Sequence, residues 1–191
     1  MGLEKELGRK AVHLSWGIVL LIYLWLEKSY GRPALYFPFI LLLAFLLVDF
    51  LRVQYGFRLP IGQGLLHEKE TRTFFTPTTT MMAITIALAV FKKEVAVAAI
   101  LMMVFGDLAA HIGGKLFGRT DIGHTGKTLE GGAAGAAVSL VVGTLVLGSL
   151  TVALPMALTA TIAELYTKDL DDNLFIILFA GLAGQLMLTG V

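Results

Sequence analysis

The segment 105–132 holds the basic side chains best placed to bind a phosphate, and it reads FGDLAAHIGGKLFGRTDIGHTGKTLEGG. Lys127 and Thr128 come directly before an apolar run, so we expect them at the N-terminus of a helix. That end of a helix has unpaired N–H groups and a partial positive charge, which favour an anion. Arg119 adds a guanidinium, whose planar fork matches phosphate geometry. The pattern predicts a phosphate-binding loop.

Single positions exclude two better-known motifs. A P-loop ending at Thr128 would need a glycine where Asp121 stands, and no strand is expected before it. The run 67–72 would match a zinc-protease motif only if a histidine replaced Thr71. We interpret 67–72 as a solvated loop with one or two site residues.

Asp107 is the first acidic candidate, because it follows an uninterrupted apolar run over 95–105. An ionisable group in a membrane span costs at least ~2.5 kcal/mol on insertion scales unless it is paired or solvated. His111 and Lys115 follow at helical spacing and share its face. Asp107 is therefore a candidate metal ligand or catalytic group, and the alternative is an internal Asp–His or Asp–Lys pair that only holds helices together.

Glu130 lies three residues after Lys127, in the first turn of the expected helix. A carboxylate there can bind Mg²⁺, which accompanies triphosphates and prefers oxygen ligands. The alternative is a partner for the helix dipole or a salt bridge to Lys127. Gly131 and Gly135 belong to a small-residue face that suits close helix packing.

A second acidic group lies near the C-terminus, where Glu164 is followed by Asp171-Asp172-Asn173. One of the last three residues is expected to cap a helix. The remaining carboxylates, brought beside Asp107, could hold a metal or take a proton from an attacking hydroxyl. His13, inside an otherwise apolar start, is a further candidate for that role.

The composition indicates the class of protein whose fold holds these side chains. Hydrophobic residues make up 57% of the 191 residues without counting 21 glycines, and charged residues only 15%, against ~25% in soluble proteins. So little polar surface cannot cover a soluble domain, which predicts an integral membrane protein. The absence of cysteine excludes disulfide scaffolds and thiolate metal sites, and a net charge of +1 gives no nucleic-acid footprint.

The predicted fold is all-α: a polytopic transmembrane helix bundle of about seven spans, forming one domain over 1–191. A span needs ~20 largely apolar residues, and the apolar stretches are 11–26, 35–51, 74–91, 95–117, 129–148, 150–166 and 174–191. Thr76-Pro77 suits the start of the third helix, Gly113-Gly114 is expected to end the fourth early, and Gly148-Ser149 makes a turn between the fifth and sixth.

The distribution of the basic residues predicts how the chain is oriented in the membrane. With seven spans, eleven basic residues fall on the N-terminal side and four on the other, so the N-terminus is predicted to be cytoplasmic. All four histidines and most acidic candidates lie on or near the same face: His13, His67, Glu68, Glu70, Asp107, His111, Asp121, His124, Glu130, Glu164, Asp169, Asp171 and Asp172. This concentration predicts a site facing the cytoplasm, in which a water-soluble substrate meets a lipid.

Together these residues resemble a known family. The segments are Arg9-Lys10-x-x-His13, Gly106-Asp107, Phe117-Gly118-Arg119, Lys127-Thr128-Leu129-Glu130-Gly131, and Glu164 with Asp171-Asp172-Asn173. Their order over nearly the whole chain is similar to the dolichol kinase, phytol kinase and CTP-dependent diacylglycerol kinase family. The resemblance implies a multi-span enzyme that transfers the terminal phosphate of CTP to a lipid alcohol.

The resemblance also links 106–131 to the nucleotide, and phosphoryl transfer requires cations, Mg²⁺ and a group that orients the alcohol. The expected nucleotide-binding residues are Lys115, Gly118, Arg119, Lys127, Thr128 and Gly131. The expected Mg²⁺ ligands are Asp107, Glu130 and Asp172. The expected catalytic residues are Asp107, Asp172, Glu164 and His13.

Two other functions stay open at this point. A cytidylyltransferase acting on a phosphatidate-like lipid would use a similar nucleotide site and release pyrophosphate. An ion-coupled transporter would use the same intramembrane acids, although the glycine-rich basic segment occurs once and transporters usually show repeated halves. The expected partners are a lipid alcohol, a nucleotide and membrane lipids.

Overall fold

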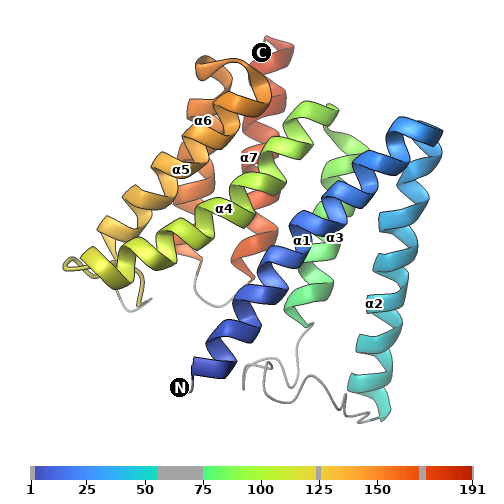
Figure 1. Cartoon of the computed structure of the whole chain (residues 1–191), viewed down its shortest axis with the longest axis horizontal. Helices are drawn as coiled ribbons and strands as arrows, with labels where there is room; N and C mark the ends of the chain where they lie inside the picture. Colours follow the sequence, from blue (N-terminus) through green and yellow to red (C-terminus); the bar gives the residue numbers. More distant parts are fainter. Residues whose placement is uncertain (1–2, 56–74, 124–125, 168–170, 191) are drawn as a thin grey trace. The chain divides into compact units, whose positions relative to one another are not determined.

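The computed structural model describes residues 3–55, 75–123, 126–167 and 171–190, with side chains from His13 onward. Its regular structure is helical apart from one isolated bridge (Figure 1). The elements are α1 (Leu3–Tyr30), the short 3₁₀ helix η1 (Arg32–Leu35), α2 (Tyr36–Tyr55), α3 (Thr76–Val90), α4 (Lys93–Phe117), α5 (Leu129–Leu147), α6 (Leu150–Tyr166) and α7 (Asp172–Thr189). The expected all-α fold is confirmed for these residues.

Each predicted apolar stretch overlaps one α-helix, with two differences at helix ends. The first helix begins earlier than expected, because the polar residues before the apolar run are good helix formers. The prediction that Gly113-Gly114 ends the fourth helix is wrong, since α4 continues to Phe117. A Cβ on Gly113 would lie 2.6 Å from the Cβ of Ala134, so this glycine allows α5 to pack closely.

Four helices in the described part of the chain are long and apolar enough to cross a membrane. They are α4, α5, α7 and the helical stretch Arg32–Tyr55 that joins η1 and α2. Helices α3 and α6 are apolar but shorter. The expectation of an integral membrane protein is thus supported by several helices that could span a bilayer.

The chain divides into two compact units, Met1–Thr85 and Ile86–Val191. The first unit contains α1, η1, α2 and the first part of α3. In this unit the rings of Trp16 and Phe45 lie 6.1 Å apart, which joins α1 to α2. The Thr85 hydroxyl donates a hydrogen bond of 3.3 Å to the carbonyl of Pro38, which joins α3 to α2.

Asp49 is a buried anchor of the first unit, with only 2% of its surface exposed. Its Oδ1 lies 2.9 Å from a terminal nitrogen of Arg52 and accepts a 3.0 Å hydrogen bond from Arg52 Nε. Its Oδ2 accepts a 3.0 Å bond from the N–H of Phe75, the residue before α3. One carboxylate therefore ties the C-terminal part of α2 to the start of α3.

The second unit is organised around α4, which contacts α5, α6 and α7. Small residues let these helices approach closely. A Cβ on Gly184 of α7 would lie 3.0 Å from Val95 of α4, and one on Gly143 of α5 would lie 3.1 Å from Ala153 of α6. The core of this unit is correspondingly rich in buried alanine and methionine.

A tight turn brings the polar ends of these helices to one side. Gly148 adopts a positive φ of 64° between α5 and α6, as expected for the predicted Gly148-Ser149 turn, and α6 runs back along α5. The end of α4, the start of α5, the end of α6 and the start of α7 therefore lie at the same end of this unit (Figure 1).

Candidate functional site

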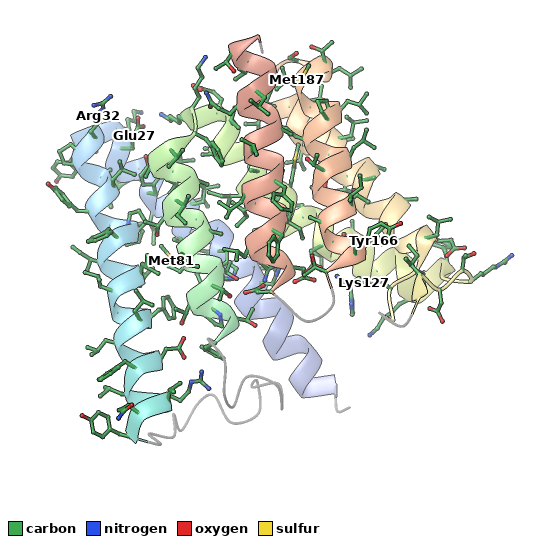
Figure 2. All side chains as sticks on the ribbon, turned by 180° about the vertical axis from the view of Figure 1, so that it is seen from behind. Glu27, Arg32, Met81, Lys127, Tyr166 and Met187 are labelled. Carbon is green, nitrogen blue, oxygen red and sulfur yellow. The ribbon has the colours of Figure 1, made fainter. Side chains whose placement is uncertain are left out.

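The side chain of Lys127 joins three elements at this end of the second unit. Its ammonium donates a 2.8 Å hydrogen bond to Asp172 Oδ2, in the first turn of α7, and another to the carbonyl oxygen of Glu164, in the last turn of α6. Figure 2 shows Lys127 at the end of the bundle where α6 ends at Tyr166. The sequence prediction that the basic loop and the C-terminal acids belong to one site is consistent with this contact.

Glu164 is buried in the same region, with 7% of its surface exposed. Its carboxylate interacts electrostatically with Asp107, Lys127 and Asp172. The candidates Asp107, Glu164, Asp172 and Lys127 are therefore brought together from α4, α6, α7 and the loop before α5. They combine three carboxylates with one ammonium, an arrangement that attracts a further cation.

The loop between α4 and α5 is built as a short hairpin. Ile122 N–H donates to the carbonyl of Lys127 at 2.8 Å, and Leu129 N–H donates to the carbonyl of Thr120 at 2.9 Å. Asp121 and Thr128 form the isolated bridge between its two sides. Gly126, with a φ of 72°, allows the backbone to turn immediately before Lys127. The hairpin thereby fixes the point from which the lysine extends.

The start of α5 differs from the expectation in one respect. Thr128, which was expected at the N-terminus of this helix, is its N-cap, and its hydroxyl accepts a 3.2 Å hydrogen bond from Gly131 N–H. Because Leu129 N–H is bound by Thr120, two amides expected to be unpaired are already used within the chain. The prediction that this helix end offers unpaired N–H groups to a phosphate is wrong at those two amides. Side chains are left as the main phosphate donors.

Glu130 has a role in the loop. Its Oε2 accepts hydrogen bonds from the N–H groups of Arg119, at 3.1 Å, and Thr120, at 3.2 Å. Its Oε1 accepts a 2.9 Å bond from the Thr120 hydroxyl. The carboxylate thus holds the hairpin against the first turn of α5, which differs from both roles weighed from the sequence, a Mg²⁺ ligand and a Lys127 partner.

The predicted Mg²⁺ ligands Asp107, Glu130 and Asp172 do not form a ready-made metal centre. Within the described ranges, no three acidic or histidine side chains are grouped closely enough to hold a metal ion. Glu130 is engaged in the loop, and Asp172 is bound by Lys127. Mg²⁺ in phosphoryl-transfer sites is usually held by one or two carboxylates together with the phosphates.

The start of α7 confirms the capping prediction. Asp171 is the N-cap, and its Oδ1 accepts a 3.0 Å hydrogen bond from Asn173 N–H. Asp172 Oδ1 accepts from the same N–H at 3.1 Å, while its Oδ2 faces Lys127. The two adjacent aspartates therefore have different tasks, one in capping and the other in the site.

The remaining candidates lie at the end of α4, at the start of α5, on α1 or outside the described residues. Lys115, Gly118 and Arg119 are exposed at the end of α4, His111 is exposed one turn earlier, and Gly131 is buried against α4. His13 is half-buried on α1 in the first unit. The candidates outside the described residues are His67, Glu68, Glu70, His124 and Asp169.

Sequence reasoning missed two groups. Thr120 binds Glu130, but a lone threonine in a loop gives no signal of that contact. The pair of Asp49 and Arg52 did have a signal, an aspartate inside an apolar run with an arginine three residues later. Such spacing puts both side chains on one helix face.

Comparisons of this chain with family models, curated proteins and solved structures found no match. Its function therefore has to be inferred from its own residues and from the motif resemblance.

Proposed function

We propose that this chain is a membrane lipid kinase that transfers the terminal phosphate of CTP to the hydroxyl of a lipid alcohol. The observation that carries the proposal is the contact of Lys127 with Asp172 and Glu164. Phosphoryl transfer needs a cation that binds phosphate next to acids that bind Mg²⁺ or the acceptor hydroxyl. These residues come from separate motifs of the dolichol kinase, phytol kinase and diacylglycerol kinase resemblance, and they meet at one place.

The proposed phosphate ligands are the side chains of Lys127, Arg119 and Thr128. The guanidinium of Arg119 is exposed on the loop. The hydroxyl of Thr128 accepts a bond from Gly131 N–H, and a hydroxyl that accepts can still donate its own proton to a phosphate oxygen. Lys127 would exchange or share its present oxygen partners when a phosphate binds.

Mg²⁺ would enter as the metal complex of the triphosphate and thus as part of the substrate. Asp107 and Asp172 are the carboxylates that we propose to contact it, since Glu130 is engaged with the loop.

The preference for CTP over other triphosphates is taken from the family resemblance. The proposed acceptor is also taken from the resemblance and is one of several lipid alcohols: a polyprenol or dolichol, phytol or geranylgeraniol, or diacylglycerol.

The proposed active site faces the cytoplasm. Eleven basic residues fall on the N-terminal side of a seven-span arrangement and four on the opposite side. The loop with Lys127 belongs to the more basic side. This orientation would let a nucleotide reach the loop from the aqueous phase, while the acceptor's apolar chain remains among the helices.

The test follows the labelled phosphates of CTP. Purified protein in lipid nanodiscs would receive CTP labelled at the γ or the α position, with Mg²⁺ and a panel of lipid alcohols. We expect γ label in the lipid and release of CDP. Transfer of the α label with pyrophosphate release would identify a cytidylyltransferase. No turnover with any acceptor, together with ion flux in vesicles, would favour a transporter and overturn the proposal.

A further inference from the structure

An apolar groove lies in the first unit, where α1 turns into α2. It has a volume of about 350 Å³, close to the lower limit of ~300 Å³ for small-ligand pockets. Its lining comes from the end of α1, from η1 and from the start of α2, and consists of Leu26, Tyr30, Pro33, Ala34, Phe37 and Ile40. The Tyr30 hydroxyl is the one polar side-chain group of these six residues, so the groove suits an apolar chain.

The backbone of the turn gives this groove a floor and two rims. Gly31, with a φ of 67°, lets the chain leave α1, and its carbonyl accepts a 3.0 Å hydrogen bond from Ala34 N–H. Ala34 is only 4% exposed, whereas Tyr30 is 65% and Ile40 is 63% exposed. Because Ile40 is four residues into α2, the groove extends about 6 Å along that helix. It therefore has room for the first part of a lipid chain.

The residues of this turn carry an excess of positive charge. Lys28 and Arg32 are exposed, and Glu27 is the one acid between Leu26 and Ile40. Figure 2 labels Arg32 and Glu27 at this end of the first unit. The helical stretch that is long and apolar enough to cross a membrane begins at Arg32. A bilayer around that stretch would place the arginine at the level of the lipid headgroups and the groove beside the first carbons of the lipid chains.

We propose that this groove binds one chain of an anionic phospholipid, whose phosphate is bound by the guanidinium of Arg32. A guanidinium can bind two phosphate oxygens through parallel N–H bonds, and Arg32 comes directly before the lining residue Pro33. A cation followed by an apolar groove matches the order of phosphate and chain in such a lipid. An uncharged lipid alcohol lacks the phosphate, and a free nucleotide lacks the chain. The site uses residues of the first unit alone, so it does not depend on the proposed kinase function.

The test measures lipid binding to the full chain in detergent by native mass spectrometry. The probes are dioleoyl phosphatidylglycerol and dioleoyl phosphatidylcholine, which have the same chains and differ in net charge. We expect phosphatidylglycerol to bind at least ~5-fold more tightly, because each Lys or Arg near a membrane surface favours an anionic lipid by about that factor. The choline cation of the other lipid is in addition repelled by Lys28 and Arg32.

Two variants separate the headgroup from the chain. Arg32→Gln should lower the affinity for phosphatidylglycerol by ~5-fold or more and leave phosphatidylcholine nearly unchanged. Ala34→Leu adds carbons to the floor of the groove and should weaken both lipids alike by at least ~10-fold, the factor expected when two methylene groups are displaced. Lys92→Gln, which removes an exposed lysine before α4, is the control and should change neither affinity.

A photoreactive phosphatidylglycerol with a diazirine in its chain tests the wild-type protein, so the result does not depend on the folding of a variant. Its labels should fall within 26–40, on lining residues such as Phe37 and Ile40. An excess of unlabelled phosphatidylglycerol should suppress these labels, whereas an uncharged lipid alcohol should not.

Three results would overturn the site: labels confined to other helices, equal binding of the two lipids by the wild-type protein, or an unchanged preference in Arg32→Gln. Suppression of the labels by the alcohol as effectively as by phosphatidylglycerol would assign the groove to the acceptor chain and overturn the phospholipid proposal. The transfer of labelled phosphate from CTP is measured separately, so the kinase function can stand or fail independently of this site.

Discussion

The ammonium of Lys127 is bound by Asp172 and by the carbonyl of Glu164, so a phosphate that binds it must share or replace these partners. A lysine is suited to such an exchange, because its flexible stem and three donors adapt to more than one geometry. The hairpin before α5 limits this freedom by fixing the backbone on both sides of the lysine.

Lys127→Met tests the phosphate role at this residue. A hydrogen bond to a charged group contributes ~1.5–3 kcal/mol, so KM for CTP should rise at least ~10-fold. KM for the alcohol should change far less, since the lost contact belongs to the nucleotide. Lys92→Met, which removes an exposed lysine before α4, serves as the control and should leave both constants near wild type. A larger rise for the alcohol than for CTP would contradict the assignment.

Asp107→Asn tests the acid that follows the apolar run of α4. Asparagine preserves the shape and removes the charge, so the protein should fold while kcat falls by ~10²-fold or more if Asp107 contacts the reacting phosphate or its metal. Steady-state kinetics and thermal unfolding in detergent measure the two effects. Near-normal turnover would return Asp107 to the alternative considered from the sequence, an internal pair that holds helices together.

At the scale of elements, α4 and α5 pack through small residues next to the site. A Cβ on Gly113 would lie 2.6 Å from the Cβ of Ala134, and one on Gly131 would lie 2.7 Å from the carbonyl of Ala110. These helices position Asp107 and the hairpin relative to each other. Their separation therefore controls the geometry of the site as well as stability.

Gly113→Ala should destabilise the protein by ~1–3 kcal/mol, because overpacking forces the helices apart. Gly17→Ala is the matched control, since a Cβ on this helical glycine meets no atom within 4 Å. It should be neutral or stabilising by up to ~1 kcal/mol through helix propensity. Thermal unfolding of both variants in the same detergent provides the comparison. Equal effects would show that helix propensity decides the outcome at both positions.

The pair of Asp49 and Arg52 is the second element-scale feature, because it joins α2 to the start of α3. Asp49→Asn removes the negative charge that Asp49 places beside the Arg52 guanidinium, whose side chain is 9% exposed, and should destabilise the protein by ~3–5 kcal/mol. The double variant Asp49→Leu with Arg52→Leu removes both charges and should be more stable than Asp49→Asn. A double variant as unstable as the single one would indicate that the bond to Phe75 N–H is the main contribution.

For the whole molecule, the lengths of α3 and α6 raise the question of which helices cross a bilayer. Fifteen residues in α3 rise ~22 Å, which is short of a hydrocarbon core of ~30 Å. The contacts of Lys127 show how α6 lies beside its neighbours. Lys127 comes just before α5, and its side chain touches the end of α6 and the start of α7. Helices α5 and α6 therefore run antiparallel, and the end of α6 lies beside the start of α5.

Reporter fusions at the N-terminus, within 118–126 and at the C-terminus test the topology. With seven crossings, the first two should report a cytoplasmic position and the third the opposite side. Opposite reports from the N-terminus and 118–126 would mean that one of the four preceding helices, most simply the short α3, does not cross. A cytoplasmic C-terminus would contradict the crossing of α5, α6 and α7.

Much of the fold could be predicted from the sequence, because membrane helices are encoded locally. Apolar runs of sufficient length place helices without knowledge of their neighbours, and Thr76-Pro77 and Gly148-Ser149 mark boundaries through backbone geometry. The prediction that Gly113-Gly114 ends the fourth helix was wrong because it used such a local rule. The effect of this glycine pair depends on α5, which packs against it, and no local rule contains that partner.

The sequence by itself determined which residue types are available for chemistry: a basic glycine-rich loop, an acid after an apolar run and acids near the last helix. Only the tertiary structure decided how they are used. It joined Lys127 to Asp172, bound Glu130 to the hairpin, paired two N–H groups at the start of α5 within the chain, and buried Glu164. The physical reason is that helix formation depends on neighbours in sequence, whereas the partner of a charged group depends on which helix ends meet in space.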